Sequence, residues 1–418
     1  MKNTQAVNIR CLAIVLCLLA ESAAAAPQGD AMHQELEALK KRVDELESRQ
    51  LTSGGEIEAK ESASETSAAE NDDESFDVGG ALRFNYVLKN FDDNQQSRRG
   101  DMGLDIFRLN VDGRKGNIIL STEYRFYSYM NAIHHGWLGY DFDDGGQLQV
   151  GISQVPFGLL PYDSHNFWFG VPYYIGLGDD YDAGVKYVID GQPWNIQLAF
   201  YKNAELGNAT DLERYSYDLV STGSTSNEET NTVNGRIAYL FGEGSECQHE
   251  LGLSLQWGQL YNRDTDKNGD QWASALHLDS RCGRWNFQLE GGRYVYSPQN
   301  PLGVSDETVT FGAFGGSHDV AAKANFGVAN IAYNLPVAGL GVDILTCYND
   351  FSVLSKDASG FANSYLNTTG CAIGVGPTFT YIDIVRGRNM LFFGDGSLAG
   401  GGSNDWDTRL NINLGYYW

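Results

Sequence analysis

The sequence predicts an all-β protein: a 16-stranded antiparallel transmembrane β-barrel that follows an N-terminal coiled-coil helix. From residue 76 onward, apolar and polar residues alternate with a period of two, which places one face of each strand in an apolar medium. The connections between these strands are alternately short and long, a pattern typical of membrane barrels. After the N-terminal segment, no apolar run approaches the ~18 residues of a membrane-spanning helix.

Residues 1–25 are predicted to be a secretory signal peptide. Lys2 and Arg10 make its start basic, residues 11–20 are apolar, and Ala23 and Ala25 fit the small-residue pattern of a cleavage site. We therefore expect export to an oxidising compartment and, for a barrel of this kind, a place in the cell outer membrane.

Residues 26–50 are predicted to form a coiled-coil stalk in the periplasm. The apolar residues of this segment are spaced by four, three, four and three, which is a heptad seam: Met32, Leu36, Leu39, Val43 and Leu46. So short a helix is marginal in isolation, so self-association is expected. Residues 51–75 carry eight acidic residues and one lysine, which predicts a flexible acidic linker before the barrel at 76–418.

Sixteen segments are strand candidates, and the last is expected to close the ring against the first. In the last segment, Leu410, Ile412 and Leu414 alternate with polar residues up to the terminal Trp418. The candidates are 81–89, 107–112, 117–129, 141–144, 148–155, 183–190, 194–203, 232–241, 250–259, 272–279, 285–294, 330–335, 342–350, 369–376, 379–385 and 408–418.

Charge and motifs exclude several classes of function. The formal net charge of −25 argues against nucleic-acid binding, which needs a basic surface. The chain has no GK[ST] phosphate loop, no HExxH zinc motif and no nucleophile elbow, so neither an enzyme nor a cofactor is predicted. The expected partners are membrane lipid, further copies of the chain and small solutes.

Residues 146–170, GQLQVGISQVPFGLLPYDSHNFWFG, resemble the phosphate-selective type of 16-stranded porin, and residues 181–191 and 368–389 fit the same pattern. The resemblance implies passive diffusion of small hydrophilic solutes and, for members with an N-terminal coiled coil, a homotrimer. Residues 161–187 also resemble the siderophore-porin branch, which implies energy-independent passage of a ferric siderophore. From Gln154 to Val185 there is no Lys or Arg, so phosphate selectivity is not expected.

The loop after the fifth strand is predicted to fold into the lumen and to form the pore constriction. Its acidic side chains would oppose a partly basic wall and set a field across the pore. On this basis we expect small cations to pass at least as readily as chloride. An anionic organic solute would require a basic strip of Arg83, Arg108 and Arg125 opposite the loop. The predicted constriction and lumen residues are Arg83, Arg108, Glu123, Arg125, Asp163, His165, Asp179, Asp180, Asp182, Lys186 and Arg236. A plainer alternative is that the arginines only pair with lumen carboxylates such as Glu123.

Four cysteines follow the signal peptide, and three pairings are possible. Strand order favours Cys247 with Cys282, at the short-turn ends of neighbouring strands, and Cys347 with Cys371, at the outer ends of theirs.

Two segments could suggest a metal, but neither predicts one. His134 and His135 are adjacent, and adjacent residues of a strand point to opposite faces, so two rim positions are expected. Asp264, Asp266, Asn268 and Asp270 match part of a calcium loop, but Ala275 replaces the bidentate Glu. The simpler prediction for that segment is an Asn-Gly hairpin turn.

The sequence thus predicts a porin for small hydrophilic solutes, with a ferric-siderophore porin as the alternative within the same class. A structural or adhesive membrane anchor is the alternative from another class. An energy-coupled receptor is not expected, because the 343 residues from 76 to 418 are too few for 22 strands and a plug.

Overall fold

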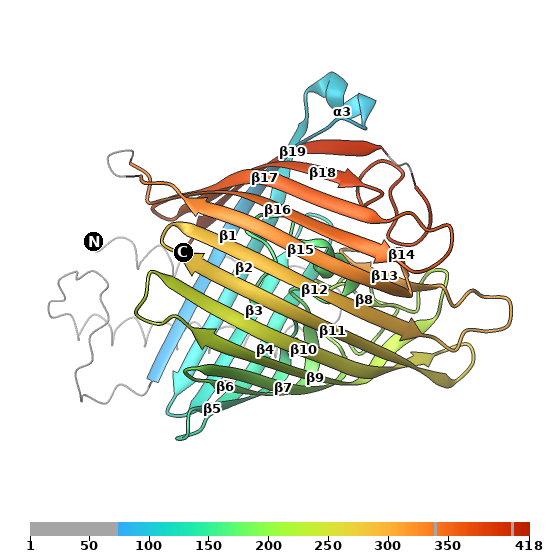
Figure 1. The fold of residues 1–418 in the computed structure, drawn as a ribbon, viewed down its shortest axis with the longest axis horizontal. Helices are drawn as coiled ribbons and strands as arrows, with labels where there is room; N and C mark the ends of the chain where they lie inside the picture. The colour runs from blue at the N-terminus through green and yellow to red at the C-terminus, as the bar shows by residue number, and fades with distance from the viewer. Residues whose placement is uncertain (1–73, 338–340, 403–404) are drawn as a thin grey trace, which may run out of the picture. The chain divides into compact units, whose positions relative to one another are not determined.

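The computed structural model describes residues 74–337, 341–402 and 405–418. Sixteen antiparallel strands in these ranges form one closed barrel (Figure 1). No helix in the described ranges is long and apolar enough to cross a membrane. The predicted signal peptide, coiled coil and nearly all of the acidic linker lie outside the described residues, except that Glu74 and Ser75 already belong to the first strand.

The barrel strands follow the chain around the ring, and each pairs with its neighbours in sequence except where strands outside the barrel intervene. They are β1 (Glu74–Lys89), β2 (Asp101–Lys115), β3 (Ile118–Phe126), β4 (Asn131–Asp141), β5 (Gly146–Gln154), β6 (Tyr181–Asp190), β7 (Trp194–Ala204), β9 (Asn227–Phe241), β10 (Cys247–Asn262), β11 (Lys267–Cys282), β12 (Trp285–Ser297), β15 (Lys323–Asn334), β16 (Ile344–Lys356), β17 (Ser364–Val375), β18 (Thr378–Arg388) and β19 (Trp406–Tyr417).

The ring closes between the last strand and the first, as predicted. Leu82 of β1 lies opposite Tyr416 of β19, and Phe84 lies opposite Leu414. The backbone N–H of Gly80 donates to the carbonyl oxygen of Trp418 at 3.0 Å. A Cβ at Gly80 would lie 2.5 Å from the Trp418 ring, so glycine is needed at this seam.

The alternation of the sequence becomes an apolar outer face and a polar interior. On β10, the side chains of Leu251, Leu255 and Trp257 are 52%, 54% and 52% exposed, whereas Ser254 and Gln256 are buried. An exposed apolar belt of this kind is stable in lipid and unfavourable in water.

The β10–β11 hairpin continues beyond this belt. Trp257 and Trp272 lie opposite each other and mark its edge. The next outward positions carry polar side chains, including those of Gln259 and Asp270, before a turn at residues 263–266.

The connections differ at the two ends of the barrel. One end, here called the turn end, carries the connections 116–117, 142–145, 191–193, 242–246, 283–284, 335–343 and 376–377. The other, the loop end, carries the connections 90–100, 127–130, 155–180, 205–226, 263–266, 298–322, 357–363 and 389–405. The predicted alternation of short and long is correct for most connections. The exceptions are the short connections 127–130 and 263–266 at the loop end and the turn-end connection 335–343, which is longer than the loop-end connection 357–363.

The fourth strand was predicted in the wrong place. Residues 141–144 are not a strand beyond Asp141; they begin a turn in which the N–H of Phe142 donates to the carbonyl of Gly146 at 2.7 Å. The true strand, β4, was missed because a bulge breaks its period. His135 pairs with Glu123 but Ile133 pairs with Tyr124, which leaves His134 as the extra residue.

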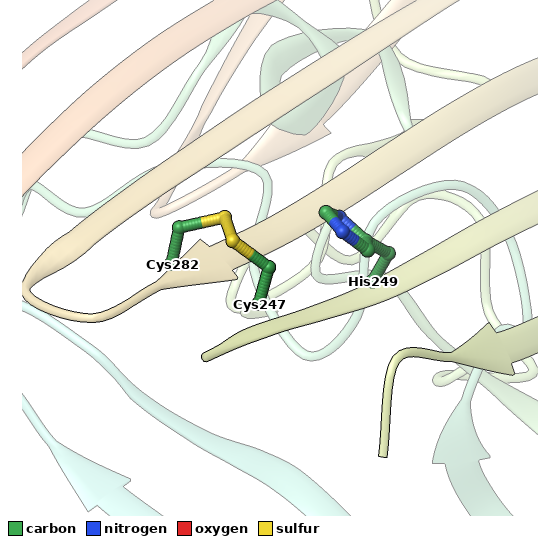
Figure 2. Close-up of side chains that lie close together, drawn as sticks. All are labelled: Cys247, His249 and Cys282. Carbon is green, nitrogen blue, oxygen red and sulfur yellow. A yellow bond between two sulfur atoms is a disulfide. The ribbon is translucent and has the colours of Figure 1, made fainter. Parts of the chain in front are cut away.

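Both disulfides join residues directly opposite each other on adjacent strands, in the pairs that strand order favoured. Cys247 bonds to Cys282 across β10 and β11, with His249 beside them (Figure 2). Cys347 bonds to Cys371 across β16 and β17. The expected position of the second pair was wrong: Cys347 is near the start of β16, toward the turn end, because that strand continues to Lys356, six residues past its predicted end.

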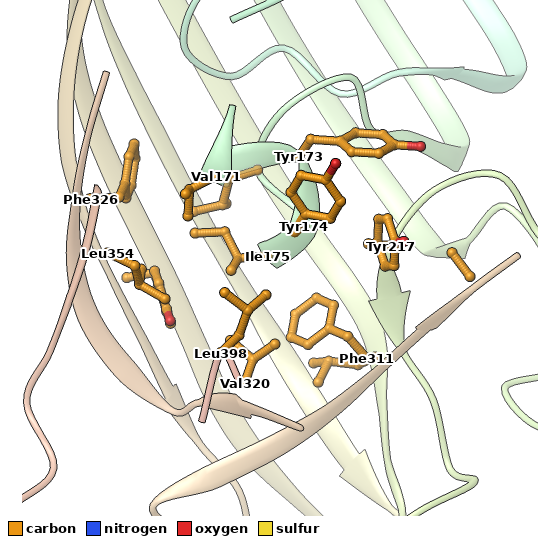
Figure 3. Close-up of a cluster of buried hydrophobic side chains, with 14 of the residues drawn as sticks. Val171, Tyr173, Tyr174, Ile175, Tyr217, Phe311, Val320, Phe326, Leu354 and Leu398 are labelled. Atoms are coloured by element: carbon orange, nitrogen blue, oxygen red, sulfur yellow. The ribbon is translucent and has the colours of Figure 1, made fainter. Parts of the chain in front are cut away.

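A small sheet and two short helices occupy the loops. The sheet consists of β8 (Asp218–Leu219), β13 (Thr308–Ala313) and β14 (Gly316–Ala321) and was not predicted. The helices are α3 (Asp93–Arg98) and η1 (Val171–Ile175). Side chains of η1 pack in a buried apolar cluster with Phe311, Val320 and Leu398 from the other loops (Figure 3).

Candidate functional site

Loop 155–180, which joins β5 to β6, lies inside the barrel. Its backbone reaches side chains on strands far around the ring, which only a loop that crosses the lumen can do. Backbone N–H groups donate from Gly158 to Ser254 Oγ (3.0 Å), from Leu159 to Glu290 Oε2 (2.9 Å), from His165 to Asp350 Oδ2 (2.7 Å) and from Val171 to Ser352 Oγ (2.9 Å). The predicted pore-folded loop is therefore present.

His165 anchors this loop to the wall. Its Nδ1 is 2.8 Å from Asp350 Oδ1, and its Nε2 is 2.7 Å from Asn286 Oδ1. Burial lowers the pKa of His165, but the hydrogen bond and the charge of Asp350 outweigh it, so the pKa is raised overall. His165 also lines the cavity described below.

Two predicted lumen cations hold the start of the same loop. Arg236 donates from Nε to the carbonyl of Gly158 at 2.9 Å and pairs with Glu250. Lys186 donates from Nζ to the carbonyl of Gln154 at 2.8 Å. Both side chains are buried, and neither lines the cavity.

A cavity of about 820 Å³ lies between the loop and the wall formed by β1–β3, β18 and β19. Among the residues of the described chain that line it, five are cationic and one is a carboxylate, Asp105. The cations are Arg83, Lys89, Arg108, Arg125 and Arg409.

Three of the cations form a strip on neighbouring strands. This basic strip consists of Arg83 on β1, Arg108 on β2 and Arg125 on β3. Arg83 Nε is 2.8 Å from Asp105 Oδ2; Glu123 bonds to Arg125 Nε at 2.5 Å and lies 3.5 Å from Arg108 Nη1. The arginines therefore pair with carboxylates, and the three cations on neighbouring strands share two acids.

The guanidinium groups are held against aromatic rings. Such stacking is favourable when the groups are partly desolvated. The distances to the ring centroids are 5.1 Å for Arg83 over Phe167, 5.4 Å for Arg108 over Tyr417, 4.3 Å for Arg125 over Tyr215 and 3.8 Å for Arg409 over Trp168. The opposite side of the cavity is aromatic, with Tyr162, Phe169, Tyr173 and Tyr174 of the loop.

Sequence reasoning missed Arg409 and Lys89. Both lie on strands that were identified, at positions that alternate with outward-facing Leu410 and Leu88, so the period-two pattern already places them on the lumen side. Within the described chain, neither forms an ion pair with a carboxylate at 4.0 Å or less.

The predicted acidic residues do not line this cavity. Asp163 accepts from the N–H of Gly170 at 3.2 Å, and burial raises the pKa of its carboxyl to about 7. Asp179 accepts from the Tyr215 hydroxyl at 2.5 Å, and burial raises the pKa of its carboxyl to about 6. Asp180 and Asp182 are buried together elsewhere. The field expected from these acids is therefore not set at the cavity surface.

The expectation that His134 and His135 point to opposite faces is wrong. Their Nδ1 atoms are 2.8 Å apart, because the bulge at His134 turns its side chain to the same side. The His134 ring lies 4.2 Å from that of Tyr181. Glu123 is near enough to complete a three-residue metal group, but its carboxylate already bonds to Arg125.

The weak calcium candidate lies at the β10–β11 hairpin. Asp264 and Asp266 are in the turn, where Asp266 accepts from the Tyr261 hydroxyl at 2.6 Å and has a positive φ of 53°. Asn268 and Asp270 belong to β11. The turn therefore precedes the Asn-Gly pair, and these four residues do not form a metal-ligand group in the described chain.

Comparison with known proteins supports the fold. No family profile and no curated protein matches the sequence. OmpT of Vibrio cholerae is 14% identical over 84% of this chain and 99% of its own, with a TM-score of 0.53. OmpF of Salmonella typhi, solved with daunomycin, is 12% identical over 84% and 99%, with a TM-score of 0.56. An anion-selective porin from Comamonas acidovorans is 11% identical over 82% and 100%, with a TM-score of 0.50. The chain therefore has the fold of a 16-stranded outer-membrane porin.

Proposed function

We propose that the protein is a passive diffusion channel of the outer membrane that favours small organic anions. The observation that carries this proposal is the cavity between the basic strip and the aromatic loop. A porin-like barrel supplies the route, and the fixed cations supply the preference.

In this proposal, the charged residues that line the cavity determine the ion preference, rather than the net charge of the whole chain. Glu123 does not line the cavity, but it offsets part of the charge of Arg108 and Arg125. With Glu123 counted beside Asp105, five cations still face two carboxylates. The expectation that cations pass at least as readily as chloride rested on the negative net charge of residues 76–418 and on loop acids that do not line the cavity. We propose anion preference in its place.

The aromatic side of the cavity adds a second preference. Rings on the loop offer flat apolar surface, while guanidinium groups bind carboxylates through directed hydrogen bonds. A solute that carries both a ring and a carboxylate would contact the aromatic rings of the loop and the guanidinium groups of the barrel wall at the same time. A ferric siderophore with anionic groups would use the same cavity and is a solute to test.

The proposal includes assembly of the protein into a homotrimer. Residues 26–50 would join three copies through the heptad seam, with the stalk in the periplasm and the turn end on that side. Lipid would surround the apolar belt of each barrel.

The test is the zero-current potential of the purified protein in a planar bilayer under a KCl gradient. The parent should be anion-selective, and Arg83→Gln and Arg409→Gln should each shift the potential toward cation preference. Arg293→Gln is the matched control: it removes one positive charge, but Arg293 pairs with Asp357 outside the cavity. The expected order of liposome flux is an aromatic carboxylate above a neutral sugar of similar size.

Cation preference in the parent, or equal shifts in all three variants, would contradict the proposed selectivity. Absence of any conductance would instead support the structural or adhesive anchor.

A further inference from the structure

Three buried carboxylates meet at the loop end of the barrel, apart from the cavity. Asp180 ends loop 155–180, Asp182 is in β6, and Asp218 is in β8. Their side chains are 7%, 3% and 1% exposed, and one carboxylate oxygen from each lies within 4.8 Å of the others. We call these residues the carboxylate cluster.

The surrounding charge does not neutralise the cluster. Glu205 and Glu229 add two more acids whose charges act on Asp182. The basic side chain beside them in the described chain is Arg214, whose Nη1 lies 3.4 Å from Asp218 Oδ2 and 3.5 Å from Glu205 Oε2. Five carboxyl groups therefore lie together with one guanidinium group beside them.

One ligand atom of the cluster is also unsatisfied. Asp182 Oδ1 is buried and has no hydrogen-bond partner in the described chain. Asp180 accepts from the backbone N–H of Tyr181 at 2.9 Å, which satisfies one of its oxygens. A buried carboxylate oxygen without a donor is costly, so a bound cation or a proton must compensate.

The pKa directions express the same cost. Burial, together with the charges of neighbouring acids, raises the pKa of Asp180 and of Glu205 well above the usual range of a carboxyl group.

The geometry suits a calcium-sized ion. Calcium binds oxygen ligands at about 2.3–2.6 Å, so no two of its ligand oxygens are more than about 5.2 Å apart. The three carboxylate oxygens of the cluster lie within 4.8 Å of one another, so one ion can contact all of them. All donors are carboxylates, whereas zinc prefers nitrogen and sulfur ligands and magnesium usually keeps several waters.

We propose that Asp180, Asp182 and Asp218 bind one calcium ion, which ties loop 155–180 and β6 to loop 205–226. This site is separate from the calcium candidate at the β10–β11 hairpin. The proposal goes beyond the channel function and does not depend on it.

The site would position part of the cavity wall. Asp179, next to Asp180, bonds to the Tyr215 hydroxyl, and Tyr215 lines the cavity three residues before Asp218. The N–H of Tyr181 also donates to Ser216 Oγ at 3.0 Å. An ion at the cluster would hold these two loop segments together.

The first test measures calcium binding by the intact protein in detergent, after EGTA treatment and removal of the chelator. Equilibrium dialysis with radioactive calcium should find one tightly bound ion per chain. Calcium should also raise the thermal unfolding midpoint. If no tight ion binds, or if calcium leaves the midpoint unchanged, the proposal is wrong.

The second test assigns the site. Asp182→Asn combined with Asp218→Asn should abolish tight binding. Asp264→Asn combined with Asp266→Asn, which removes the same charge from the exposed hairpin, should leave it unchanged. Loss in the hairpin variant but not in the cluster variant would overturn the assignment. If the cluster variant fails to fold, the parent measurements still decide whether the protein binds calcium. None of these measurements uses conductance, so they are independent of the proposed channel.

Discussion

Replacing Gly158 with alanine should release loop 155–180 from the barrel wall. Gly158 has a positive φ of 62°, and an added Cβ would lie 2.3 Å from Glu290 Oε1 and 2.7 Å from its Cδ. Since Glu290 accepts the N–H of Leu159, the methyl group would displace the acceptor that holds the loop.

The magnitude follows from two contributions. A non-glycine residue in the left-handed region costs about 1–2 kcal/mol. Loss of a hydrogen bond costs about 0.5–1.5 kcal/mol. The local cost is therefore about 1.5–3.5 kcal/mol, and the bond from Arg236 to the Gly158 carbonyl would be weakened as well. The strands themselves keep their pairing.

Single-channel recording is the assay. Gly158→Ala should give a larger and noisier conductance than the parent, because the loop no longer narrows the lumen at a fixed place. Gly291→Ala is the matched control: it lies next to Glu290, and its added Cβ would have no atom within 4 Å. If Gly158→Ala and Gly291→Ala both behave like the parent, the loop is not held by this contact and the reasoning fails.

Three further predictions concern pH, a disulfide and the stalk. Because the folded-state pKa of Asp163 is raised to about 7 from an ordinary 3.8, stability should fall as the pH rises from about 4 to about 7. Asp163→Asn should reduce this dependence of the thermal midpoint, and an unchanged slope would contradict it. Serine at both Cys347 and Cys371 should lower the unfolding free energy by about 3 kcal/mol relative to the oxidised parent, on a chain-entropy estimate for 24 residues, measured by denaturant titration; equal stability of the two would contradict it. Serine at the seam positions Leu36, Leu39 and Val43 should weaken trimers without preventing barrel insertion. Trimers as heat-resistant as those of the parent would show that the seam is dispensable.

The barrel could be predicted because each strand repeats one physical constraint. Lipid outside and polar groups inside impose a period of two, and that period is legible along the terminal strand through Leu410 and Leu414. The prediction of strands fails where a strand departs from the period-two alternation. The bulge at His134 shifts the alternation by one residue, so β4 does not show a continuous period of two. For that reason the sequence predicts a strand in the acidic turn that follows β4.

The candidate site was harder to predict than the barrel. Arg83, Arg108 and Arg125 were identified because strands fix which way a side chain points. No comparable rule applies to a loop, where Asp163 and Asp179 turned away from the cavity and aromatic rings turned toward it. The carboxylate cluster joins Asp180 to Asp218, 38 positions along the chain, and only the tertiary structure brings them together.

The β10–β11 hairpin determines which part of the protein a large particle would meet. The hairpin continues five residues past Trp257 on one strand, about 17 Å at 3.3–3.4 Å per residue, and returns through the turn at 263–266. With the tryptophans at the lipid boundary, antibodies, phages and proteases would reach this tip before they reach the mouth of the barrel. If the turn end faces the periplasm, as proposed, a short epitope inserted in this turn would be displayed at the cell surface, away from the loop that lines the cavity.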